Sequence, residues 1–119
     1  MSEVELFPGR VSLLGLGAIP HADIAGHSGR SATLLDLALA CAVQTLLEKG
    51  ETYTTAEFKV NLIRPITPRT GEVVCEGRVV HKDRTLAVSE ATLKDSDAKL
   101  LAFGTETCSI FPVANLAAR

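Results

Sequence analysis

Hydrophobic and polar positions divide the chain into one helix-like stretch and several strand-like stretches. Across residues 31–49, apolar side chains cover most of a helical circumference, which predicts a long helix enclosed by the rest of the fold. Ser28 or Ser31 is the expected N-cap, and Gly50 has the position of a C′ residue. At ~1.5 Å per residue, this helix would span roughly 28 Å, the width of a small sheet.

Alternating and β-branched runs predict strands on both sides of this helix. Before it, residues 3–9 form a short alternating segment, residues 10–16 form a candidate strand, and residues 17–26 have the composition of a loop. After it, four strands are expected, at residues 53–63, 72–81, 85–93 and 99–111. A strand, a helix and a four-strand antiparallel meander together predict a two-layer α+β domain.

The alternation in residues 72–81 is clear enough to assign faces. One face is expected to hold Val73, Cys75, Gly77, Val79 and His81. The short turn at residues 82–84 then predicts antiparallel pairing with residues 85–93. Because one chain can cover its sheet only partly, we expect the protein to self-associate.

Length and composition narrow the classes of function. The 119 residues are enough for one domain, expected to span 1–119 with a tail at 113–119. The net charge is −2, no basic block is present, and the aromatic residues are four phenylalanines and one tyrosine. These features argue against nucleic acid and membrane surfaces as partners. The amino end is acidic, unlike a signal peptide, and the apolar helix contains Asp36 and Gln44, so we expect a soluble, cytoplasmic protein.

Other reactive side chains are spaced without a metal-binding pattern. The cysteines lie in apolar runs and are expected to be buried free thiols: Cys41, Cys75 and Cys108. The histidines match no zinc spacing, so no bound metal is expected: His21, His27 and His81. Four basic side chains near two turns would either bind a phosphorylated ligand or remain solvated: Arg64, Arg69, Lys82 and Arg84.

Asp36 is an ionisable side chain set among apolar residues early in the predicted helix. Burying a carboxylate without a partner is costly, so either a bond to a neighbouring strand or a chemical role would explain it. In a chemical role it would act as a general base or as a nucleophile. The backbone N–H groups of Ser28, Gly29 and Arg30 could then receive a developing oxyanion.

Several linked motifs resemble the PaaI-like (phenylacetic acid degradation type) acyl-CoA thioesterases of the hotdog fold. The family pattern H-G-G-x-x-x-x-L-x-D is similar to residues 27–36, which run from His27-Ser28-Gly29 to Leu34-Leu35-Asp36. Further matches are Y-T-T and K-V-N-L-I-R-P within residues 53–65, G-R-V-V-H at residues 77–81, and L-L-A and T-C within residues 100–108. The resemblance covers about residues 27–111, and residues 1–26 match poorly.

This resemblance implies a central helix wrapped by a curved antiparallel sheet of about five strands. It also implies homodimers whose sheets join edge to edge, and often homotetramers. The implied function is hydrolysis of a small-molecule acyl-CoA, with no metal and no cofactor beyond the CoA of the substrate. A non-hydrolytic acyl-CoA-binding or assembly protein is the alternative, because Ser28 replaces the first glycine and His21 stands where the family usually has asparagine. A hotdog dehydratase, which would use His27 beside the acid, fits the pattern less well.

The resemblance also implies roles for individual residues. Asp36 would be the catalytic carboxylate, activating water or attacking the thioester, and the Gly29 N–H would bind the oxyanion. His27 would order the loop, and Thr55 of the partner subunit would assist at the reacting centre. The residues implied to line the substrate and its CoA are Ser28, Asn61, Arg64, Pro65, His81, Lys82, Arg84 and Thr85. The acyl group and the choice between dimer and tetramer stay open.

Overall fold

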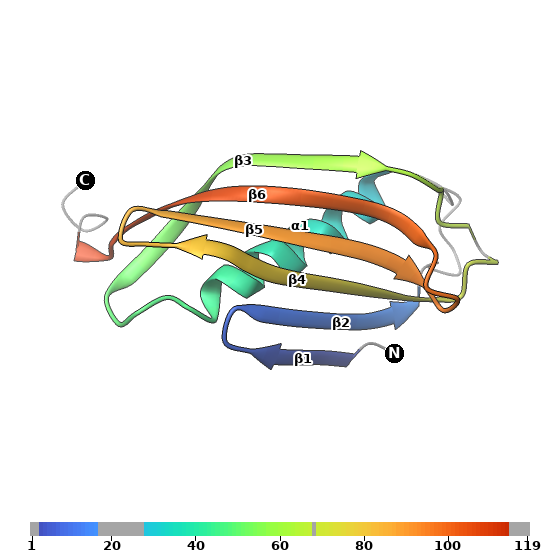
Figure 1. Ribbon diagram of the computed structural model, residues 1–119, viewed down its shortest axis with the longest axis horizontal. Helices are drawn as coiled ribbons and strands as arrows, with labels where there is room; N and C mark the ends of the chain where they lie inside the picture. The colour runs from blue at the N-terminus through green and yellow to red at the C-terminus, as the bar shows by residue number, and fades with distance from the viewer. Residues whose placement is uncertain (1–2, 17–27, 68, 115–119) are drawn as a thin grey trace.

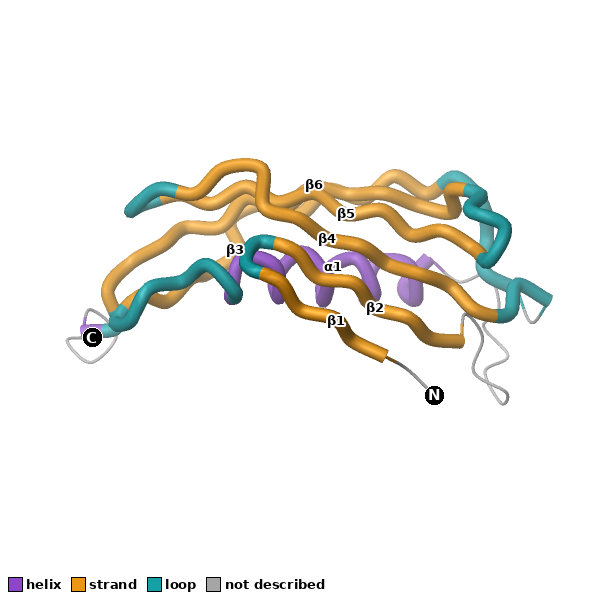
Figure 2. The backbone as a smooth tube through the Cα atoms, turned by 60° about the horizontal axis from the view of Figure 1, so that its bottom comes forward, coloured by secondary structure: helices purple, strands orange, loops and turns teal. Residues whose placement is uncertain are grey.

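A computed structural model describes residues 3–16, 28–67 and 69–114. The elements in chain order are β1 (Glu3–Phe7), β2 (Arg10–Leu16), α1 (Ser28–Gln44), β3 (Glu51–Leu62), β4 (Glu72–Lys82), β5 (Leu86–Asp95) and β6 (Leu100–Pro112). All six strands form one antiparallel sheet in the order β1-β2-β4-β5-β6-β3 (Figure 1). The helix α1 lies along one face of this curved sheet (Figure 2). The predicted α+β arrangement is confirmed, with β1 as a sixth strand beside the expected five.

The position of β3 differs from the predicted four-strand meander. β3 pairs with β6 at the far edge of the sheet, with Thr55 opposite Cys108. β4 instead pairs with β2 on one side and with β5 on the other. The meander prediction was wrong because β2 already occupies the free edge of β4. The connection at residues 63–71, which contains Pro65, carries the chain across the end of the sheet.

The helix begins and ends earlier than the apolar pattern predicted. α1 spans Ser28–Gln44 rather than residues 31–49, so both expected N-cap serines lie inside it. Thr45 ends the helix, because its hydroxyl donates to the carbonyl of Ala42 (2.7 Å) and accepts from the N–H of Gly9 (2.7 Å). In the described parts of the chain, no helix is long and apolar enough to cross a membrane.

One side of α1 packs on the sheet and the other side is open. The core-facing side chains of α1 are fully buried: Leu35, Ala38, Leu39, Ala42 and Val43. On the open side, Asp36 is exposed and Leu37 is 50% exposed. The predicted enclosure of the helix is therefore wrong for the single chain, because one sheet covers only one side of a helix.

Small residues let α1 lie close to the middle of the sheet. A Cβ atom placed at Gly77 of β4 would lie 2.6 Å from the carbonyl oxygen of Ala38. Beside this contact, the hydroxyl of Ser89 in β5 donates to the carbonyl of Leu39 at 3.2 Å. These two contacts fix the distance of α1 from the sheet and its position along β4 and β5.

The alternation of β4 changes face near the end of the strand. Val73 and Gly77 are buried, as predicted, but His81 is exposed. The register shifts between Val79 and His81, which places His81 opposite Val88. This bulge turns His81 to the outer face of the sheet, so its assignment to the inner face was wrong.

The three cysteines are free, as predicted. Cys75 and Cys108 are buried, whereas Cys41 is only half-buried. Burial raises the pKa of Cys75 to about 12, so this thiol stays protonated and behaves as a small core side chain.

Candidate active site

Asp36 lies next to a buried glutamate of β6. Glu106 is 1% exposed, and it stands opposite Ser89 in the sheet. Because Ser89 bonds to the carbonyl of Leu39, this part of β6 lies about one helical turn from Asp36. The two carboxyl groups are close enough for the charge of Asp36 to act on Glu106.

Two hydrogen-bond donors from the same chain hold Glu106. Its Oε1 accepts from the hydroxyl of Thr55 at 2.9 Å and from the thiol of Cys108 at 3.1 Å. Its Oε2 is buried and has no hydrogen-bond partner among the residues that the structure describes. We call Asp36, Thr55, Glu106 and Cys108 the acid cluster.

Burial favours the neutral forms of two groups in the acid cluster. Desolvation raises the pKa of Glu106 above its ordinary value of 4.5, the bonds from Cys108 and Thr55 partly offset this, and neighbouring Asp36 raises it further. Desolvation, with help from Glu106, raises the pKa of Cys108 to about 12, so Cys108 is a thiol and not a nucleophilic thiolate. Within the described ranges, no group of three or more histidine, cysteine or acidic side chains is arranged to hold a metal ion.

A bulge in β3 aims Thr55 at the acid cluster. The register shifts between Thr55 and Glu57, and Phe58 is then paired with Glu106. Directly opposed residues share one face of a sheet, so the bulge keeps both Thr55 and Phe58 on the helix side. The chain's own Thr55 therefore bonds to Glu106, the neighbour of Asp36, while the implied role of Thr55 of a partner subunit at the reacting centre stays a prediction.

The first turn of α1 supplies backbone donors on the same side of the helix as Asp36. N–H groups in a first turn have no intrahelical partner, and α1 begins at Ser28. Gly29 precedes Asp36 by nearly two full turns, so the two share a face about 10.5 Å apart along the axis. His27 lies outside the described residues.

The two segments expected to line CoA lie at opposite ends of the sheet. At one end, Leu62 of β3 pairs with Ala102 near the start of β6. At the other end, the turn after β4 is followed by Leu86, which pairs with Ser109 near the end of β6. The stretch from Ala102 to Ser109 corresponds to about 23 Å. One chain therefore does not bring residues 61–65 together with residues 81–85.

The first of these segments lies beside the start of the helix. Figure 1 shows the amino end of α1 at the same end of the molecule as the carboxyl end of β3. There Asn61 is half-buried and Pro65 is exposed. Arg64 is exposed, but its Nη1 donates to the carbonyl of Leu100 at 2.8 Å. Asn61, Arg64 and Pro65 thus lie at the end of the molecule where α1 begins, away from the turn after β4.

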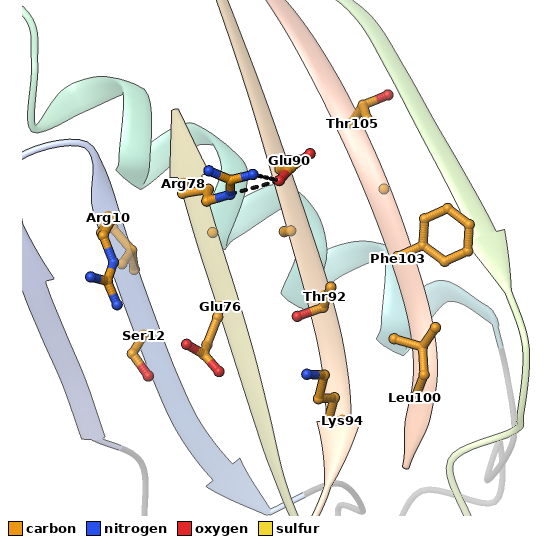
Figure 3. Close-up of a pocket in the computed structure, with 14 residues that line it drawn as sticks. Arg10, Ser12, Glu76, Arg78, Glu90, Thr92, Lys94, Leu100, Phe103 and Thr105 are labelled. Carbon is orange, nitrogen blue, oxygen red and sulfur yellow. Dashed lines mark hydrogen bonds and ion pairs between the residues drawn. The ribbon is translucent and has the colours of Figure 1, made fainter. Parts of the chain in front are cut away.

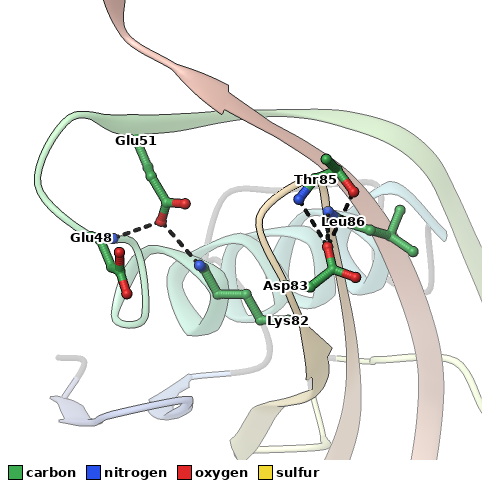
Figure 4. A network of polar contacts seen from close by, with 6 residues as sticks. All are labelled: Glu48, Glu51, Lys82, Asp83, Thr85 and Leu86. Atoms are coloured by element: carbon green, nitrogen blue, oxygen red, sulfur yellow. Dashed lines mark hydrogen bonds and ion pairs between the residues drawn. The ribbon is translucent and has the colours of Figure 1, made fainter.

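At the other end, Lys82 has an ionic partner within the chain. Its Nζ lies 3.0 Å from Oε1 of Glu51, and the two side chains are 14% and 17% exposed (Figure 4). The bond from the N–H of Glu48, followed by the bond from Lys82, lowers the pKa of Glu51. Arg84 is exposed in the same turn.

Asp83 organises the turn between β4 and β5. Its Oδ1 accepts from the N–H groups of Thr85 and Leu86, both at 2.8 Å, and from the Thr85 hydroxyl at 3.2 Å (Figure 4). Its Oδ2 lies 3.0 Å from Nε2 of His81. The bond from the Thr85 N–H, then those from His81 and Leu86, lower the pKa of Asp83 below its ordinary value of 3.8. His81 and Thr85 thus have a structural role in this turn.

Replacing Asp83 by alanine is expected to lower the free energy of unfolding at neutral pH. A carboxyl whose folded pKa is depressed stabilises the fold above its unfolded pKa, and this stabilisation is lost as pH falls through the folded value. The difference between wild type and Asp83→Ala should therefore be largest above pH 3.8 and shrink in stronger acid. Urea unfolding at several pH values checks this, with exposed Asp97→Ala as the control. A difference in the free energy of unfolding that stays constant down to the lowest pH measured would contradict this prediction.

A shallow cavity lies on the outer face of the sheet, away from α1. It has a volume of about 720 Å³, and its lining includes Arg10, Glu76, Lys94 and Phe103 (Figure 3). Arg78 pairs with Glu90 across its floor. The cavity contains no residue of the acid cluster and none of the residues predicted to bind CoA.

Glu106 is the member of the acid cluster that sequence analysis missed. No motif contains Glu106, but the alternation of inner and outer positions in the last strand places it on the inner face. The inner positions of that strand are otherwise small or apolar: Ala102, Gly104, Cys108 and Ile110. A single glutamate at an inner position of such a run was the available signal.

Fold and site together define a class of protein: a single central helix on a curved antiparallel sheet, with a carboxylate two turns from the first N–H groups of the helix. A family model of the thioesterase superfamily matches residues 26–102, more than half of the chain. The chain belongs to the thioesterase superfamily.

Solved structures with this fold resemble nearly the whole chain. A thioesterase family protein from Silicibacter pomeroyi is 29% identical with a TM-score of 0.79, covering 93% of this chain and 85% of that one. A thioesterase from Haemophilus influenzae is 21% identical (TM-score 0.80, 94% and 79% covered). A hypothetical thioesterase from Streptococcus pneumoniae, solved with coenzyme A, is 19% identical (TM-score 0.81, 94% and 87% covered). These similarities confirm the predicted hotdog fold. None of the curated proteins compared with the chain matches it.

Proposed function

We propose that the protein is an acyl-CoA thioesterase of the PaaI type. The observation that carries this proposal is the placement of Asp36 and the Gly29 N–H on one face of α1, in a chain of the thioesterase superfamily. Ser28 lies in helical conformation in the first turn, where a backbone N–H is available whatever the side chain. The missing first glycine of the family pattern is therefore compatible with hydrolysis.

The proposed reaction uses Asp36 as a general base. Water between the carboxylate and the thioester attacks the carbonyl carbon, and Asp36 takes the proton of the water. The oxyanion that forms receives a hydrogen bond from the N–H of Gly29. When the carbon–sulfur bond breaks, the carboxylic acid forms and the thiolate of CoA leaves and takes up a proton. Direct attack by Asp36 would instead form an anhydride that water then hydrolyses.

We further propose that two chains form the complete site by pairing their β3 strands. β3 is an edge strand, and residues 54–59 are exposed. A twofold axis at this edge places the Glu51 end of one β3 beside the Leu62 end of the other. The turn of the partner, held to Glu51 through Lys82, then approaches residues 61–65 of the first chain. This arrangement supports joint CoA binding by segments that one chain keeps apart, and the CoA-bound relative supports CoA as the ligand.

Replacing Leu62 by aspartate is expected to convert the proposed dimer into a folded monomer. Leu62 is 51% exposed in the single chain, so a charge there costs little until a second chain covers it. Val80 on β4 is a matched control, since it is 54% exposed and lies away from the β3 edge. Light scattering on a sizing column should show a wild-type dimer or tetramer, a Val80→Asp protein of the same size as wild type and a monomeric Leu62→Asp protein. A monomeric wild type at micromolar concentration would contradict the proposal.

A panel of acyl-CoA substrates tests the proposed function directly. Acetyl-, hexanoyl-, palmitoyl- and phenylacetyl-CoA are incubated with the protein, and free thiol is followed with DTNB. A parallel thermal-shift titration with CoA measures binding. Release of CoA with at least one substrate supports the thioesterase. Thermal stabilisation by acyl-CoA without thiol release would instead support a binding protein and would remove hydrolysis as the function.

A further inference from the structure

We propose that Glu106 is the protonated partner of Asp36, donating from Oε2 to the Asp36 carboxylate while Oε1 holds the Thr55 hydroxyl. Glu106 would thus be a positioning residue for the thioesterase reaction, and this role rests on the function proposed above. The pair would carry one proton and one negative charge, with the proton on the buried member and the charge on the open side of α1.

The hydrogen bonds around Glu106 favour such a proton. Oε1 already accepts from Thr55 and Cys108, at 2.9 and 3.1 Å. Oε2 is buried without a hydrogen-bond partner among the described residues. A charged oxygen left in this state is expensive, whereas a protonated Oε2 becomes a donor and needs only an acceptor.

Asp36 is the acceptor that the fold provides. The groups facing Glu106 are the carboxylate of Asp36 from α1, the hydroxyls of Tyr53 and Thr55 from β3, and the thiol of Cys108 from β6. On β5, Ser89 stands opposite Glu106, and its hydroxyl is engaged by a helix carbonyl. The described groups that act on Glu106 include no cation that would stabilise its charged form. Two neighbouring carboxyl groups in this environment share a proton more readily than they both ionise.

This proton would give Glu106 a defined effect on catalysis. A neutral Glu106 orients the Asp36 carboxylate by a hydrogen bond and leaves its negative charge free to accept the proton of the attacking water. When the pH rises far enough for Glu106 to lose its proton, the donor disappears and two like charges face each other. The pH profile of kcat should therefore have an alkaline limb, a fall in rate with rising pH, whose midpoint follows the titration of Glu106. Tyr53 and Cys108 have raised pKa values, with that of Cys108 at about 12, so they ionise at higher pH.

The first test measures the proton without using activity. Side-chain ¹³C NMR of labelled protein follows the Glu106 carboxyl, assigned by its absence in Glu106→Gln. Glu106 should titrate above its ordinary value of 4.5, and the titration should move to lower pH in Asp36→Asn, which removes the neighbouring charge. A Glu106 that titrates at or below 4.5, or that does not respond to Asp36→Asn, would overturn the proposal.

The second test uses the pH dependence of hydrolysis. Glu106→Gln keeps a neutral donor and acceptor, so it should lose the alkaline limb and retain more of kcat than Glu106→Leu. Glu106→Leu, which loses the donor, should lower kcat about 10²-fold, the size of effect expected from a misplaced catalytic group. Thermal unfolding establishes that each variant is folded. A Glu106→Gln profile parallel to that of wild type would overturn the positioning role, because a merely structural glutamate leaves the pH profile unchanged. If the wild type hydrolyses no acyl-CoA, the proposed function fails, and the NMR titration alone decides whether the carboxyl pair exists.

Discussion

Replacing Asp36 by asparagine is expected to lower kcat for acyl-CoA hydrolysis about 10²- to 10⁴-fold, the usual contribution of a positioned general base. Asparagine has nearly the same shape but cannot take a proton from water. Because Asp36 is exposed and the side-chain oxygen of asparagine can still accept a hydrogen bond from Glu106, the substitution should leave the free energy of unfolding almost unchanged. Thiol release from the best substrate of the panel measures the rate.

Asp97→Asn is the matched control for this substitution. Asp97 is an exposed aspartate in the turn between β5 and β6, so the same change of charge occurs far from the acid cluster. It should keep wild-type kcat. An Asp36→Asn protein whose kcat stays close to that of wild type would remove Asp36 from the mechanism. Loss of activity together with loss of folding would mean that Asp36 acts on the structure.

Gly77→Val should produce the largest loss of stability, about 3 kcal/mol or more. Overpacking a tight core site typically costs about 1–3 kcal/mol, and at this site the added side chain would collide with backbone atoms of the helix. A Cβ at this position would lie 2.6 Å from the carbonyl oxygen of Ala38 and 2.9 Å from its carbonyl carbon. Backbone atoms of a packed helix cannot swing aside as a flexible side chain can. The helix would have to move away from β4, which would also weaken the bond between Ser89 and Leu39.

Thermal or urea unfolding checks the Gly77 prediction. A loss of this size should lower Tm by roughly 10 °C in a domain of this length. Glu76→Val is the matched control, because it adds the same side chain to the same strand on the exposed outer face, where surface changes are usually within about ±0.5 kcal/mol. Equal effects of the two substitutions would show that helix contact is not the cause.

Local patterns predicted the parts of the fold that depend on near neighbours in the sequence. The apolar run identified α1, and the turn at residues 82–84 identified the pairing of β4 with β5, because hairpin partners are adjacent along the chain. The alternation in β4 correctly predicted that Val73 and Gly77 are buried. The family motifs led to the hotdog fold, and Asp36 was singled out as a carboxylate set among apolar residues early in the helix.

The rest depended on contacts between residues far apart in the sequence. The pairing of β3 with β6 leaves no local signal, so a meander was the default expectation. The bulge that turns His81 outward is a single extra residue that alternation cannot reveal. Glu106 was missed because its partners, Asp36 and Thr55, come from two other elements and are united only by the tertiary fold. Thr45 ended the helix through a bond to Gly9, which no helix-end pattern anticipates.

The edge position of β3 has a consequence for how the chain folds. Thr55 pairs with Cys108, nearly half the chain further on, whereas β4, β5 and β6 join through short turns. Closing so long a loop is entropically slow, so β3 should dock after the hairpins have formed. Until that step a folding intermediate would carry Asp36 on its helix without the hydroxyl of Thr55 bound to Glu106. Both edges of β6 are paired only when β3 arrives, so the same late step that completes the acid cluster also moves the open edge of the sheet from β6 to β3, the strand proposed to pair with a second chain.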